Sequence, residues 1–78
     1  MRPRSLRLVV TFHTTAEAMA TEQLCRREAL PGKLISVPRS LTSDCGIAWS
    51  APADLRETLE LHLQQAAIDF AGLYELEL

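Results

Sequence analysis

A strand pattern runs directly into a helix start in the stretch LRLVVTFHTTAE, residues 6–17. Side chains alternate between the two faces of a strand, so the apolar residues at alternate positions share one face. These residues are Leu6, Leu8, Val10 and Phe12, with Arg7 and Thr11 on the other face. Thr14 and Glu17 then have capping-box spacing, in which the threonine hydroxyl accepts the N3 amide and the glutamate reaches back. We therefore expect a strand to end and a helix to begin around residue 13.

The first helix should run to about Ala29 and stop at the breaker sequence Leu30-Pro31-Gly32. Period-two alternation predicts three more strands, over residues 33–38, 46–51 and 73–78. A second helix is expected between the last two strands. Asp54 and Glu57 repeat the capping spacing there, and its apolar stripe comprises Leu55, Leu59, Leu63 and Ala66.

The predicted order of elements is β-α-β-β-α-β. With right-handed crossovers this order gives an α+β, ferredoxin-like fold, a four-stranded antiparallel sheet with both helices on one face. The 78 residues form one domain, residues 1–78, because the chain has no room for a second core. In this topology the turn at residues 13–15 and the loop at residues 39–45 lie at the same end of the sheet. That end is the predicted functional site.

Composition and charge exclude several classes of protein. Hydrophobic residues make up 47% and charged residues 23% of the chain, which is typical of a folded domain rather than a disordered one. No apolar run is long enough to cross a membrane, and no secretory signal is recognisable. The net charge of −2 argues against nucleic-acid binding. A cytoplasmic location is therefore expected.

The charge is unevenly distributed along the chain. Residues 1–39 carry seven basic and three acidic side chains, and residues 40–78 carry one basic and seven acidic side chains. Such a division could orient a partner or a second copy of the chain. It could also vanish in space if the two halves interleave, which is the more common outcome in small folds.

Cys45 is the residue most indicative of chemistry. It lies between polar residues and a glycine, in Ser43-Asp44-Cys45-Gly46, whereas a structural cysteine usually lies within an apolar pattern. Gly46 leaves space beside the sulfur and allows unusual backbone angles. The helix amino terminus expected at the same end of the sheet, together with Arg39, would favour a thiolate, and Asp44 would oppose it.

Four other residues could contribute to a site or to the core, and two of them, His13 and Glu22, allow alternative interpretations. Cys25 falls in the middle of the first helix and is expected to pack as a small apolar side chain. His13 could exchange a proton with a sulfur species or be an exposed loop histidine, and His62 is read as a histidine at the edge of the core. Glu22 could pair with Arg39 or a backbone amide near the core, or point to solvent. No cluster has the spacing of a metal site and no cofactor motif is present, so neither a metal nor a cofactor is expected.

The chain resembles a bacterial family of small proteins, first catalogued as a domain of unknown function and later labelled selenium/sulfur carrier-like. The segments that carry the resemblance cover almost the whole chain in order: Phe12-His13-Thr14-Thr15, Ala18, Glu22, Val37-Pro38-Arg39 and Ser43-Asp44-Cys45-Gly46. Thr14 stands where the family usually has serine, and the hydroxyl is kept.

The resemblance implies a carrier that holds sulfur or selenium on Cys45 as a persulfide or selenosulfide, rather than an autonomous enzyme. Thr14, Thr15, Arg39, Ser43 and Gly46 would shape the site or stabilise its anion. A cysteine desulfurase or an enzyme of selenium metabolism would be the partner, and a homodimer is a further possibility. Two alternatives remain, a non-catalytic ligand-binding or protein-interaction module and a thiol-based redox sensor.

Overall fold

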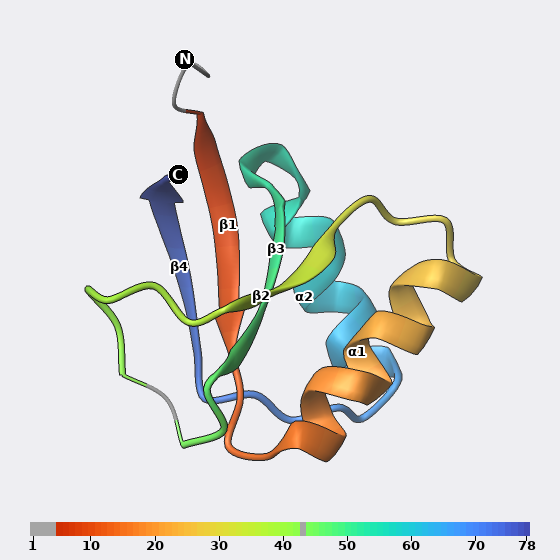
Figure 1. The fold of residues 1–78 in the computed structure, drawn as a ribbon. Coiled ribbons are helices and arrows are strands. Elements are labelled where there is room, and N and C mark those ends of the chain that lie inside the picture. The colour runs from red at the N-terminus through yellow and green to blue at the C-terminus, as the bar shows by residue number, and fades with distance from the viewer. Residues whose placement is uncertain (1–4, 43) are drawn as a thin grey trace.

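The computed structural model describes residues 5–42 and 44–78 and has the predicted order of elements (Figure 1). A short 3₁₀ turn, η1, precedes the second helix. The elements are β1 (Leu6–Thr11), α1 (Thr15–Arg27), β2 (Lys33–Ser36), β3 (Ile47–Pro52), η1 (Ala53–Leu55), α2 (Arg56–Gln65) and β4 (Gly72–Glu77). The predicted ferredoxin-like α+β fold is confirmed.

The four strands form one sheet in the order β2-β3-β1-β4, with every neighbouring pair antiparallel. In the centre of the sheet Val10 lies opposite Trp49 of β3 and Leu73 of β4. The end of β1 therefore lies beside the starts of β3 and β4. This is the end of the sheet where the sequence places the functional site (Figure 1).

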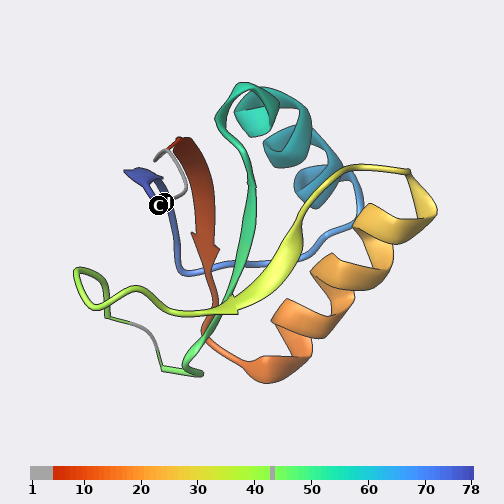
Figure 2. The same cartoon turned by 45° about the horizontal axis from the view of Figure 1, so that its top comes forward.

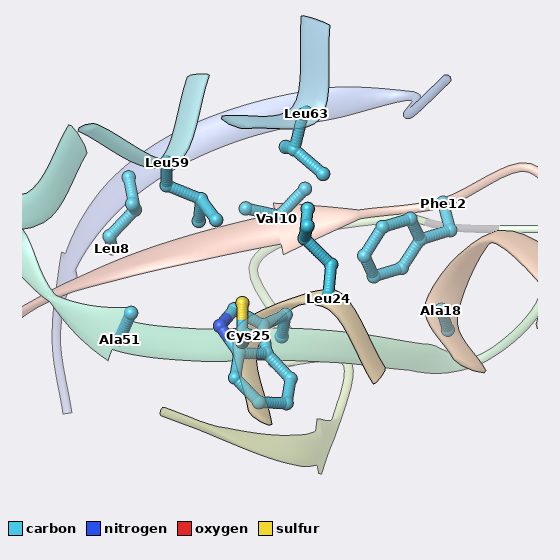
Figure 3. Packing of buried hydrophobic residues seen from close by; sticks show 10 residues of the cluster. Leu8, Val10, Phe12, Ala18, Leu24, Cys25, Ala51, Leu59 and Leu63 are labelled. Carbon is cyan, nitrogen blue, oxygen red and sulfur yellow. The ribbon is translucent and has the colours of Figure 1, made fainter. Parts of the chain in front are cut away.

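Both helices lie on one side of the sheet, and the long β2–β3 connection projects away from them (Figure 2). Apolar side chains of the strands meet the helices in one core. Figure 3 shows Val10 of β1, and Phe12 directly after it, converging with Leu24 of α1 and Leu63 of α2. The buried cluster comprises Leu8, Val10, Phe12, Ala18, Leu24, Cys25, Trp49, Ala51, Leu59 and Leu63. The period-two face predicted for β1 is thus its core face, apart from Leu6, which is 50% exposed.

The start of α1 matches its prediction in detail. The Glu17 amide donates to Thr14 Oγ1 at 3.2 Å, and the Thr14 amide donates to Glu17 Oε1 at 3.4 Å. The helix ends two residues earlier than expected, at Arg27. Ala29 adopts a left-handed φ of 55°, and the Leu30 amide donates to the Cys25 carbonyl at 2.8 Å. This is the closing bond of a Schellman-type helix end.

The predicted cap of the second helix is wrong. Asp54 lies inside η1, and α2 begins at Arg56 with Leu55 as its N-cap and no side-chain capping bond. A capping residue needs an extended backbone, and the 3₁₀ turn that follows Pro52 directly does not provide one at Asp54. Of the expected stripe, Leu59 and Leu63 are buried, whereas Ala66 caps the end of the helix and is exposed.

Strand β2 is shorter than the predicted range of residues 33–38. It ends at Ser36, although the Val37 amide still donates to the Gly46 carbonyl at 3.1 Å. Pro38 has no N–H to continue the ladder. The chain therefore leaves the sheet at Pro38 and makes a turn closed by the Leu41 amide, which donates to the Pro38 carbonyl at 2.9 Å.

Candidate functional site

Cys45 lies at the end of the β2–β3 connection, two residues before the start of β3. Its thiol donates to the Ile47 carbonyl at 3.3 Å, and the side chain is half-buried against the rim of the core. The thiol is therefore held in a defined position at the end of the sheet and is still partly open to solvent. No disulfide joins Cys25 and Cys45.

Gly46 gives the chain a backbone conformation that other residues rarely adopt. Its φ is +74°, in the left-handed region, and a Cβ placed there would meet no atom within 4 Å. The glycine is thus required by the backbone conformation rather than by crowding. This turn directs the chain from Cys45 into β3.

Cys25 has the opposite environment. It lies in the last turn of α1 rather than in the middle of the helix, and it is fully buried, as expected for a core residue. Burial in the core raises the pKa of its thiol from the ordinary value of 9.0 to about 11. A buried thiol with a raised pKa is a poor nucleophile, so Cys25 is a structural residue.

The start of α1 lies at the same end of the sheet as Cys45. Thr11 pairs with Ala48, so the chain segments that lead to Thr14 and back to Cys45 leave the sheet side by side (Figure 1). The Thr14 hydroxyl is engaged in the capping box, and Thr15 is the first residue of the helix and is exposed. Thr14 therefore shapes the helix start, and the backbone amides of the first turn are the groups that can favour an anion.

Arg39 and Ser43 belong to the β2–β3 connection. Arg39 is exposed, in the turn closed by Pro38 and Leu41. In both overall views this turn, drawn in yellow-green, lies well away from the start of α1 (Figures 1 and 2). Ser43 lies outside the described residues. The role of both residues at the site stays a prediction.

Glu22 pairs with Arg26 of the same helix at 3.3 Å rather than with Arg39, and its side chain is about one-fifth exposed. Arg26 lies one helical turn after Glu22, so the observed contact is within α1. His62 lies at the edge of the core, as expected. Its Nδ1 is 2.8 Å from the Thr58 carbonyl, and its Nε2 is 3.7 Å from Glu28.

His13 lies beside the acidic side chains of Glu17 and Asp69. The spacing of these residues in the sequence did not indicate that all three meet. Its Nδ1 is 3.2 Å from Glu17 Oε1 and 4.0 Å from Asp69 Oδ2. The sequence predicts only a capping role for Glu17, and Asp69 is not among its candidate site residues. His13 and Asp69 are far apart in the chain, and no local sequence signal links them.

The fold and site define a small ferredoxin-like α+β domain with one accessible cysteine at the end of its sheet. Residues 7–75 match the family model described as "Putative Se/S carrier protein-like", and the chain belongs to this family. The resemblance seen in the motifs is thereby confirmed. No curated protein and no solved structure matches the chain. Within the described residues, no helix is long and apolar enough to cross a membrane.

Proposed function

We propose that the protein carries a sulfur or selenium atom on Cys45. The observation that carries the proposal is the contrast between its two cysteines. Cys25 is sealed in the core, whereas Cys45 is partly accessible beside a glycine at the end of the sheet. Family membership supports the same assignment. Two cysteines that are not joined by a disulfide suit the reducing cytoplasm, where we place the carrier.

Loading is a thiol exchange. The Cys45 thiolate attacks the terminal sulfur of a persulfide on a donor protein, a bond forms between the two sulfurs, and the S–S bond of the donor breaks. Cys45 then holds a persulfide, and the donor cysteine leaves as a thiolate. A donor that carries selenium would transfer it in the same way as a selenosulfide. No external oxidant or reductant is consumed.

The contact between Cys45 and Ile47 predicts a small movement during loading. The neutral thiol donates to the Ile47 carbonyl, and a thiolate has no proton to donate. Ionisation therefore removes the contact, and the sulfur would turn away from the carbonyl oxygen toward solvent. In that position the Cys45 sulfur would be accessible to the persulfide of a donor protein.

The charge of a loaded persulfide would be stabilised by backbone amides of the first turn of α1. Glu17 accepts from the amides of His13 and Thr14, so the donors for an anion would be the amides of Thr15 and Ala16. Arg39 would add a positive charge if the turn of the β2–β3 connection bends toward Cys45.

The test measures the intact mass of the reduced protein after incubation with a cysteine desulfurase and cysteine. A parallel reaction uses selenocysteine, and reductant is absent from the last step. Wild type, Cys25→Ala and Cys45→Ser are compared, with circular dichroism to verify their folding. We expect one added sulfur or selenium atom on wild type and Cys25→Ala, and none on Cys45→Ser.

An adduct that persists on Cys45→Ser would contradict the assignment of the site. No adduct on folded wild type, with Cys45 reactive toward a thiol reagent, would contradict the carrier function. That result would favour a ligand-binding or protein-interaction module.

A further inference from the structure

His13 brings an imidazole nitrogen close to carboxylates from two other parts of the fold. Its Nδ1 lies 3.4 Å from Glu17 Oε2, in the first turn of α1, and 4.0 Å from Asp69 Oδ2, in the α2–β4 connection. The three residues each offer a ligand atom, and these atoms lie within 4.8 Å of one another.

Backbone amides orient both carboxylates. Glu17 Oε1 accepts from the His13 amide at 2.7 Å, and Asp69 Oδ1 accepts from the Phe70 amide at 2.9 Å. The other oxygen of each carboxylate lies within reach of His13 Nδ1. Each side chain can therefore keep its backbone hydrogen bond and still offer an oxygen to a shared ligand.

The sheet determines that these segments meet. Thr11 pairs with Gly72 of β4, and the Ala71 amide donates to the Thr11 carbonyl at 2.8 Å. Asp69 is thereby placed next to the turn that carries His13. Their proximity depends on the β1–β4 register and not only on the positions of flexible side chains.

We propose that His13, Glu17 and Asp69 form a binding site for one divalent transition-metal ion, represented by Zn²⁺. One imidazole and two carboxylates suit Zn²⁺ and its neighbours, whereas Mg²⁺ and Ca²⁺ prefer sites made of oxygen alone. The ligand atoms of tetrahedral Zn²⁺ lie about 3.3 Å apart. A small movement of the Asp69 side chain, which is 82% exposed, closes the remaining gap, and water completes the coordination.

The amino terminus of α1 opposes a cation, because its amides carry partial positive charge. Glu17 compensates for this effect, since its Oε1 accepts from the amides of His13 and Thr14. The site contains neither cysteine and does not depend on the proposed carrier function.

The test is a calorimetric titration with Zn²⁺ of the full chain carrying Cys45→Ser, which removes the accessible thiol as a competing ligand. His13→Gln and Asp69→Asn are added separately to this background. His62→Gln is the matched control, because its imidazole faces the single carboxylate of Glu28. Glu17 is left intact, since it also caps α1.

We expect one Zn²⁺ per chain in the background protein and in His62→Gln. His13→Gln should abolish binding, and Asp69→Asn should weaken it by about tenfold or more. Absence of binding by the folded background protein would overturn the site, as would binding that survives His13→Gln. Unchanged Zn²⁺ affinity in Asp69→Asn would also overturn the three-residue site, since His13 and Glu17 alone would then account for the binding.

Discussion

Cys25 and Cys45 are chemically the same side chain in two different environments. Cys25 packs in the core with a thiol pKa raised to about 11 by burial, whereas Cys45 is half-buried and donates to a strand carbonyl. Their sequence contexts indicated this difference, because Cys25 falls within a helical pattern and Cys45 between an aspartate and a glycine. The hydrogen bond of Cys45 was not predictable, since it depends on the turn made by Gly46.

The buried thiol makes stability depend on alkaline pH. The Cys25 pKa is raised in the folded state, so between pH 9 and 11 the thiol ionises in the unfolded chain before it does in the folded protein. The free energy of unfolding should therefore fall over this range, by about 2 kcal/mol from this group. Chemical denaturation of wild type and Cys25→Ala at several pH values measures this fall in the free energy of unfolding. If that free energy changes equally with pH in the two proteins, Cys25 is not the group responsible.

At the scale of elements, the two helices end in the same way. Ala29 follows α1 and Ala67 follows α2, and each has a left-handed φ of 55°. In both places the next amide donates to a carbonyl five residues earlier, Leu30 to Cys25 and Ile68 to Leu63. The breaker sequence after Ala29 indicated the first helix end, but a left-handed alanine has no sequence signature. Glycine is the usual residue at this position, since it has no Cβ.

Ala29→Gly and Ala67→Gly should each stabilise the protein. Relief of the left-handed strain exceeds the extra entropy of glycine in the unfolded chain, and we expect a gain of about 0.5–1 kcal/mol for each. Ala20→Gly, in the interior of α1, is the control and should cost about 1 kcal/mol. Urea denaturation gives the three values. A loss of stability in both end variants would show that the helices do not end in this conformation.

At the scale of the whole molecule, strand β1 is buried on both of its faces. Val10 faces the helices, whereas Val9 and Thr11 face the opposite side of the sheet, yet both are at most 1% exposed. On that side Val9 lies between Ser50 and Tyr74 in the register of the sheet. The sequence assigned only one apolar face to β1, because alternation within a strand does not show what its neighbours cover.

Val9→Ala should therefore behave as a core substitution, although α1 and α2 lie on the other side of the sheet (Figure 2). We expect a loss of about 1–3 kcal/mol from removed contacts and the cavity that remains. Leu61→Ala, at a side chain that is 52% exposed, should change stability by less than about 0.5 kcal/mol. Thermal or urea unfolding measures both. If Val9→Ala and Leu61→Ala both change the stability by a similarly small amount, the Val9 side chain is not buried on that face of the sheet.

The sequence by itself determined the order of elements, the capping box of α1 and the candidate cysteine. Each of these depends on spacing within a few residues, as with Thr14 and Glu17 or Cys45 and Gly46. Only the tertiary structure decided that His13 meets Asp69, that Val9 is sealed, and that a 3₁₀ turn replaces the Asp54 cap. The first two depend on the register of β1 with β3 and β4, and the third on how the chain leaves β3. Such contacts join residues distant in the chain or follow from packing, and local periodicity carries no information about them.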